Sequence, residues 1–159
     1  MPNYAQKIRD QIGGNESSLI ITEIYVPRRD LPDFLARAAE LLRSNRTIVI
    51  YGTVRLIEKD NESFLAWAKE PYACTIFNLL TFHTPEGIEA SARSFRGLID
   101  LAIARGGSYY LTYHKFAKPE QVMACYPQFK QFLDLKRKYD PAERFHSDWY
   151  RHYRKLFTS

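Results

Sequence analysis

The order of strand-like and helix-like segments constrains the fold of this chain more than any other feature. Residues 19–26 are rich in β-branched and aromatic residues and predict a strand, and residues 31–44 repeat apolar residues at helical spacing. Further strands are predicted at 47–58, 72–83 and 106–117, with a short helix within 60–69 and a long helix over 84–105. This order predicts an α+β fold of the ferredoxin-like, split βαβ type, in which an antiparallel sheet carries two helices on one face.

Specific residues mark the start of the second long helix and its end before the last strand. Thr84, Pro85 and Glu86 are typical of a helix start, because proline is tolerated in the first turn. A Gly-Gly pair follows the helix, and glycine is the usual residue just beyond a helix C-terminus. The stretch GGSYYLTYHKFA, residues 106–117, is therefore predicted to form the fourth strand.

Three regions are expected along the chain, whose 159 residues suffice for one domain with a substantial core. Residues 1–17 are polar and predict a linker or a short helix. Residues 18–117 contain the ferredoxin-like domain. Residues 118–159 predict helices at 118–125 and 127–139, followed by an aromatic and basic tail.

Composition and charge narrow the class of partner. The net charge of +5 arises largely in the last quarter, where acidic residues are interleaved, which favours a solvated or docking surface over a nucleic-acid interface. Cys74 and Cys125 lie in apolar segments, and the pattern of cysteines and histidines matches no metal motif, so we expect buried thiols and no metal site. No apolar run has the length of a membrane span or resembles a signal peptide, and we expect a soluble cytoplasmic protein.

The predicted sheet has one face without helices. Tyr51, Thr53 and Arg55 alternate onto that face of the second strand, and a charge in mid-strand usually has a partner. The other strands are expected to add Glu23 or Thr22, Asn78, and Tyr110 together with His114. Such a face can be covered by water, by a second copy of the sheet, or by a ligand and a second domain.

Structural explanations exist for each of these residues. Strand propensity alone accounts for the tyrosines. Arg55 and Glu23 are suited to a purely structural ion pair, and a histidine at a strand end often caps the strand or lies on the surface. Composition and periodicity therefore leave the function undetermined.

Four segments taken in order carry a family resemblance. They are TEIYVPR at 22–28, YGTVRLIE at 51–58, GGSYYLTYH at 106–114 and YPQFKQFLDLKRKYDPAERFHSDWYR at 126–151. Together they resemble the C-terminal part of FAD-linked oxidases of the vanillyl-alcohol oxidase type, the group that includes the aldonolactone and alditol oxidases. The resemblance covers residues 18–155. It implies a cap and substrate domain whose open sheet face lies over the flavin of a separate FAD-binding domain.

The resemblance also implies a reaction and a set of partners. A small hydroxyl-bearing substrate would transfer a hydride to the flavin, while the cap supplies orientation, a base and charge stabilisation. This chain shows no pyrophosphate-binding segment for FAD, so we expect a fragment or one half of a split enzyme that is inactive alone. The expected partner is an FAD-binding domain, in the same protein or as a separate chain. The C-terminal tail is expected to dock either on that domain or on the sheet of this chain. A homodimer through the open face is a further expectation.

Residue roles follow from the resemblance position by position. Arg55 resembles the strand arginine that would stabilise negative charge on substrate or reduced flavin. His114 and Lys115 both resemble residues near the flavin, and which of them acts on the substrate proton stays open. Thr53 stands where alditol oxidases have a glutamate. The residues expected to face substrate or flavin are Tyr51, Thr53, Asn78, Tyr110 and Glu23. The alternative to an oxidase cap is a stand-alone ferredoxin-like module that binds a small ligand or self-associates.

Overall fold

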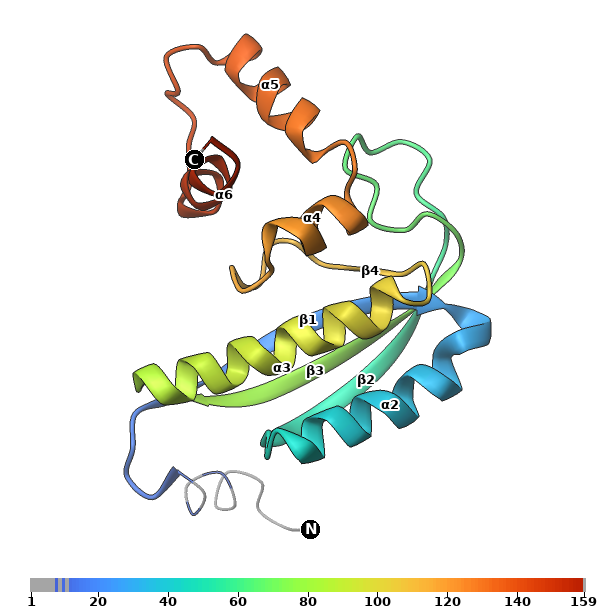
Figure 1. Cartoon of the computed structure of the whole chain (residues 1–159), viewed down its shortest axis with the longest axis vertical. Helices are drawn as coiled ribbons and strands as arrows, with labels where there is room; N and C mark the ends of the chain where they lie inside the picture. The colour runs from blue at the N-terminus through green and yellow to red at the C-terminus, as the bar shows by residue number, and fades with distance from the viewer. Residues whose placement is uncertain (1–7, 9, 11, 159) are drawn as a thin grey trace.

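A computed structural model describes residues 8, 10 and 12–158, and it contains a four-stranded antiparallel sheet with helices (Figure 1). The strands are β1 (Ser17–Pro27), β2 (Val49–Ile57), β3 (Tyr72–Phe82) and β4 (Ser108–Tyr109), in the order β2-β3-β1-β4. This confirms the predicted α+β fold. The finer ferredoxin-like assignment stays a prediction, and most of the linker or short helix expected over 1–17 lies outside the described residues.

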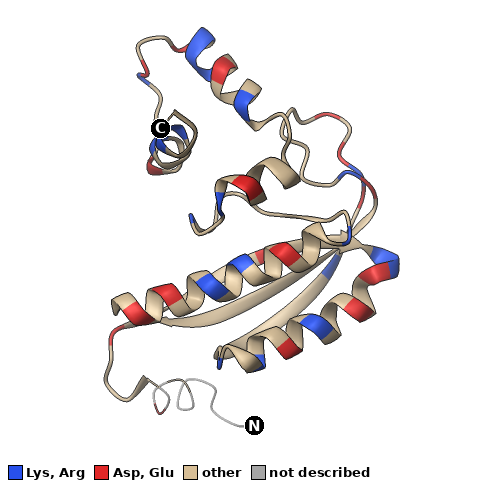
Figure 2. Ribbon diagram, in the orientation of Figure 1, with Lys and Arg blue, Asp and Glu red and all other residues tan. Residues whose placement is uncertain are grey.

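Two helices cover one face of the sheet and enclose the main core. They are α2 (Leu31–Ser44), which follows the 3-10 turn η1 (Arg28–Asp30), and α3 (Pro85–Ile103). Fully buried apolar side chains of the helices, among them Phe34, Phe95 and Ile99, meet Ile24 of β1 and Leu79 of β3. Charged residues are spread along α2 and α3, whereas the strands carry few (Figure 2).

The predicted helix start and stop are both observed. Thr84 is the N-cap of α3, and its hydroxyl accepts a hydrogen bond from the Gly87 amide at 3.0 Å. Gly106 has a φ of +69°, the left-handed conformation that favours glycine. At Gly107 a Cβ would lie 2.1 Å from the Tyr25 carbonyl oxygen, so only glycine lets the chain return beside β1.

The predicted fourth strand over 106–117 is wrong for most of its length. Only Ser108 and Tyr109 pair with β1, and the Tyr110 amide adds one hydrogen bond to the Glu23 carbonyl at 3.0 Å before the chain turns away. Side chains from later in the chain donate hydrogen bonds to the backbone carbonyls of this segment. The Tyr126 hydroxyl donates to the Tyr109 carbonyl, and the Trp149 indole donates to the Leu111 carbonyl at 2.9 Å.

The short helix predicted within 60–69 is also absent. This segment is a loop that begins with an Asx turn, in which the Asp60 carboxylate accepts the Glu62 and Ser63 amides at 3.0 and 2.9 Å. The side-chain bonds of Asp60 offer the backbone an alternative to helical bonds. Further along the loop, Trp67 and Ala68 pack against the sheet.

The C-terminal region forms three helices: α4 (Pro119–Cys125), α5 (Phe129–Tyr139) and α6 (Asp148–Thr158). Gln121 of α4 joins this region to α3, because its side-chain amide donates to the Arg96 carbonyl and, at 2.6 Å, to Asp100. The ring of Phe129 packs edge to face against that of Tyr153, with ring centroids 5.1 Å apart. Both side chains belong to the same apolar core as α2 and α3, so this core extends from the sheet into the C-terminal helices.

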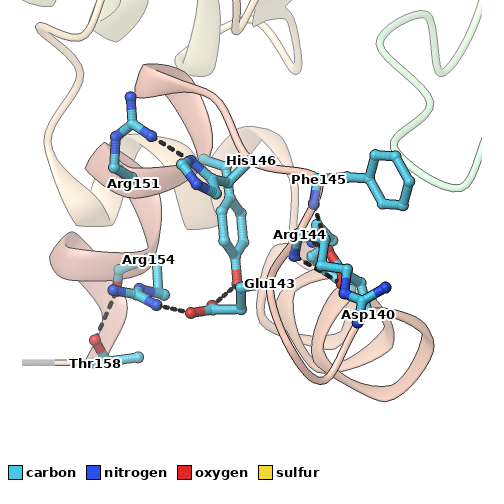
Figure 3. A network of polar contacts seen from close by, with 10 residues as sticks. Asp140, Glu143, Arg144, Phe145, His146, Arg151, Arg154 and Thr158 are labelled. Atoms are coloured by element: carbon cyan, nitrogen blue, oxygen red, sulfur yellow. Dashed lines mark hydrogen bonds and ion pairs between the residues drawn. The ribbon is translucent and has the colours of Figure 1, made fainter.

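The loop between α5 and α6 is held by a polar network (Figure 3). Asp140 accepts the backbone amides of Arg144 and Phe145, each at 2.9 Å, and also pairs with Lys136 of α5. Arg154 points to Glu143, and Arg151 points to His146, as Figure 3 shows. Many of the basic residues in the last quarter therefore have acidic partners within the chain.

Candidate functional site

The open face of the sheet, opposite α2 and α3, centres on Glu23 of β1. Its carboxylate accepts hydrogen bonds from the Tyr25 hydroxyl at 2.8 Å and from the Tyr113 hydroxyl at 3.4 Å. The Arg55 Nη1 atom lies 3.9 Å from the same carboxylate, whose side chain is only 14% exposed. We call these four residues the Glu23 cluster. It brings two hydroxyls and a guanidinium from three separate segments to one carboxylate.

The carboxylate and burial together set the protonation of the surrounding groups. The pKa of the Tyr25 hydroxyl is raised above its usual range, mainly by burial and further by the Glu23 carboxylate. The same two causes raise the pKa of Tyr113. Burial and the same carboxylate raise the pKa of the Cys74 thiol to about 12. At neutral pH Cys74 is therefore a protonated thiol, unsuited to nucleophilic attack.

Arg55 lies mid-strand in β2, opposite Cys74 of β3, and its side chain is 67% exposed. The predicted Arg55–Glu23 pair is present, but its long distance and exposure make it a weak source of stability. The guanidinium therefore offers most of its donors to the space above the open face. Its role in catalysis stays a prediction.

Asn78 adds an unusual polar group to the same face. It lies between Ile21 of β1 and Tyr51 of β2 in the strand register and is 4% exposed. Its Nδ2 atom has no hydrogen-bond partner among the described residues. An unpaired buried donor costs about 1–3 kcal/mol of stability.

The structure brings together most of the residues predicted for this face. Tyr51, Thr53 and Arg55 occupy alternate positions of β2, and their register partners are Asn78, Ile76 and Cys74 of β3. Tyr110 also belongs here, because its half-buried ring packs on the apolar cluster of the open face, which includes Tyr25 and Trp67. Thr22, the alternative to Glu23, lies on the helix-covered side.

Sequence reasoning missed the part that Tyr113 plays. Alternation through a continuous strand put Tyr113 on the opposite face from Tyr110. Because the strand ends at Tyr109, the two rings instead meet edge to face with centroids 4.9 Å apart, and the Tyr113 hydroxyl reaches Glu23. No local signal marks the end of the strand, so the pattern could not have identified this contact.

The predicted position of His114 on the open face is wrong. Its ring is 6% exposed and stacks on Phe95 of α3 with centroids 4.2 Å apart. Its Nε2 lies 3.4 Å from the Thr22 hydroxyl, and its Nδ1 faces the Phe116 amide at 3.4 Å. Burial lowers the pKa of His114 to about 4, so the imidazole is neutral at neutral pH. His114 thus packs against Phe95 and Thr22 on the helix side, and it lines the groove that Tyr113 also borders.

Lys115, the next residue, is exposed. It lines an open groove of about 480 Å³ beside β1, together with Tyr113 and Ile21. The pKa of Asp148 at the start of α6 is lowered mainly by its hydrogen bond with Arg151, and further by the charge of Lys115. Lys115 therefore lies between α6 and the edge of the Glu23 cluster. Elsewhere in the described part of the chain, no group of His, Cys, Asp or Glu is arranged to hold a metal ion.

The fold and the open polar face define an α+β domain with a helical layer on only one side of its sheet. The sequence model of the D-arabinono-1,4-lactone oxidase family matches residues 16–153. The chain belongs to this family, as the C-terminal domain of FAD-linked oxidases of the aldonolactone oxidase type. The match runs from the start of the sheet into α6 and confirms the predicted resemblance. A search of curated proteins returned no match, and no helix in the described residues has the length and apolarity needed to cross a membrane.

Proposed function

We propose that this chain is the cap and substrate-binding part of an FAD-linked oxidoreductase that oxidises a small hydroxyl-bearing molecule. Membership of the aldonolactone oxidase family gives the general class, an oxidase linked to FAD. The observation that carries the finer proposal is the open sheet face, on which an exposed guanidinium and an unpaired buried amide lie beside a tethered carboxylate.

The residues of this face suit a flavin held above them by another domain. Arg55 can face an electron-rich ring or a substrate oxygen, and the buried amide of Asn78 lies in the sheet beneath this face. When bound, FAD would supply the hydride acceptor. The candidate residues for its neighbourhood in this chain are Arg55, Asn78 and Tyr51.

This chain's own residues would orient the substrate and move its proton. Arg55 would stabilise negative charge on the substrate oxygen, since a fixed guanidinium does so without reorganising. The two candidates for proton removal, His114 and Lys115, both line the groove that Tyr113 borders, and Lys115 is the more exposed of the two. The hydroxyls of Tyr25 and Tyr113 keep the Glu23 carboxylate in place beside that groove.

The test is the absorbance of bound flavin. The chain joined to, or mixed with, an FAD-binding domain of the same family should give a yellow complex whose flavin is bleached by a hydroxyl substrate. Arg55→Ala should slow that bleaching by at least about a hundredfold, typical of losing a positioned charge. A complex that binds no flavin, or equal bleaching rates in the variant and the parent, would reject the proposal.

A second candidate function is a stand-alone module that binds a small ligand or self-associates through the open face. Tyr51 of β2, at 53% exposure, favours some covering partner. This alternative expects no flavin spectrum under any condition, and a dimer in gel filtration that Tyr51→Arg dissociates. The oxidase proposal expects this chain alone to be inactive. A cytoplasmic location, which two buried free thiols suit, remains part of the proposal.

A further inference from the structure

An apolar pocket of about 250 Å³ opens beside the Glu23 cluster, between the 60–69 loop and α6. None of its lining residues is charged. The main ones are Leu65, Trp67, Tyr110, Thr112, Tyr126 and Trp149. A cavity on the order of 150 Å³ is enough for a benzene ring, so this pocket accommodates a ring and a substituent.

Its walls expose almost no polar surface, and two of their polar groups bond within the chain. The Tyr126 hydroxyl donates to the Tyr109 carbonyl, and the Trp149 indole nitrogen donates to the Leu111 carbonyl. The pocket therefore presents mainly ring faces and methyl groups to a ligand. An apolar group that enters the pocket gives up no hydrogen bonds with water. A polyol would give up its hydrogen bonds with water and would find few groups in the pocket to replace them.

The pocket and the Glu23 cluster share a wall. The Trp67 ring lies 5.2 Å from the ring of Tyr25, whose hydroxyl binds Glu23. On the other side, the Tyr110 amide donates to the Glu23 carbonyl, and the Tyr110 ring contacts that of Tyr113. A molecule with its hydroxyl at the Glu23 cluster has this pocket directly alongside.

The geometry points to a substrate class: an alcohol that carries an apolar, preferably aromatic, ring, with the ring in this pocket and the hydroxyl at the Glu23 cluster. This inference rests on the proposed function for the role of the hydroxyl. The pocket itself is formed by this chain alone, so ring binding is measurable without flavin.

Tryptophan fluorescence gives a selective readout, because both tryptophans of the chain, Trp67 and Trp149, line the pocket. The chain is titrated with benzyl alcohol and, separately, with erythritol as a polyol of comparable size. We expect a saturable change with benzyl alcohol and none with erythritol. Thr112→Arg, at an exposed rim position, should weaken the benzyl alcohol response by about tenfold, because the new charge would lose water when the ring enters. Ser44→Arg, which adds the same charge at the far end of α2, should leave it unchanged.

Three results would overturn the inference: no saturable response to benzyl alcohol, an equal response to erythritol, or no difference between Thr112→Arg and the parent chain. The flavin assay separates this failure from that of the proposed function. A flavin complex bleached by erythritol but not by benzyl alcohol rejects the substrate class and retains the oxidase. Ring binding in a chain that never forms a flavin complex rejects the oxidase and leaves the ring site as a property of the chain.

Discussion

Arg55 reaches across β3 to Glu23, with its Nη1 atom 3.9 Å from the carboxylate oxygen Oε1. The two residues belong to strands that are not neighbours, and the small Cys74 side chain lies between them in register with Arg55. Glu23 is 14% exposed and Arg55 67%, so the carboxylate is embedded in the face while the guanidinium stands above it. This asymmetry suits a cation that acts on something outside the chain.

The first prediction separates the functional from the structural role of Arg55. Arg55→Ala should change the free energy of unfolding of the chain by less than about 1 kcal/mol, because exposed ion pairs contribute little. The same variant should slow flavin reduction in the assembled enzyme by about a hundredfold or more. Urea denaturation and stopped-flow absorbance measure the two effects.

Arg37→Ala is the matched control for Arg55→Ala. Arg37 is 57% exposed on α2 and pairs with Glu40, far from the open face. It should leave both the urea midpoint and the rate of flavin reduction close to those of the parent. A large loss of stability in Arg55→Ala with an unchanged rate would make the pair structural.

Local sequence signals predicted the central strands but not the end of the sheet. Alternation correctly grouped Tyr51, Thr53 and Arg55, because β2 pairs with β3 along nearly its whole length. It failed after Tyr109, where the carbonyls of Tyr109 and Leu111 bond to side chains 17 and 38 residues further along. Such distant donors leave no trace in a strand pattern.

The wrong prediction for His114 has the same cause, because it assumed that the strand continues past Tyr109. In a strand that continued past Tyr109, His114 would lie four residues beyond Tyr110 and share a face with it, as predicted. Once the chain turns, the ring reaches Phe95 and Thr22 in the helix-side core instead. The Glu23–Tyr113 contact was missed for the same reason, whereas the Arg55–Glu23 pair was foreseen because both residues lie in regular strands.

The second prediction concerns the buried imidazole. The folded-state pKa of His114 is about 4, below the value near 6.5 of an unfolded chain. The unfolded state therefore binds the proton more tightly, and the stabilising effect of a neutral His114 is complete above pH 6.5 and is lost as the pH falls towards 4. A shift of this size corresponds to on the order of 3 kcal/mol. Urea midpoints between pH 7 and pH 4 measure it.

A variant without the titrating ring isolates this effect. His114→Phe keeps an aromatic ring on Phe95 and should flatten the stability profile between pH 6.5 and pH 4. His83→Gln removes an exposed histidine and should leave the slope intact. If the parent and His114→Phe show the same pH dependence, His114 is not buried as described.

The third prediction tests the turn that leads from α3 to β4. Gly107→Ala would put a Cβ 2.1 Å from the Tyr25 carbonyl oxygen, which is backbone and has little room to move. We expect a loss of more than about 3 kcal/mol in the free energy of unfolding, as for other severe overpacking. At Gly106 the φ is positive but no atom lies within 4 Å of a Cβ, so Gly106→Ala should cost only about 1 kcal/mol. Thermal or urea unfolding ranks the two variants, and a reversed order would contradict the close approach at Gly107.

The last prediction concerns the loop that orients α6. The pKa of Asp140 is lowered to about 2 (Figure 3). The largest cause is its hydrogen bond with Lys136, and the backbone amides of Phe145 and Arg144 lower it further. The folded-state pKa lies below the unfolded value near 4, so the contribution of Asp140 to stability is full above pH 4 and is lost as the pH falls to 2. Asp140→Asn should lower the urea midpoint at pH 7 and bring the two proteins together near pH 2. Asp134→Asn removes an exposed helical ion pair on α5 and should have little effect at either pH. A difference between Asp140→Asn and the parent that does not shrink between pH 4 and pH 2 would show that the charge of Asp140 is not what holds this loop.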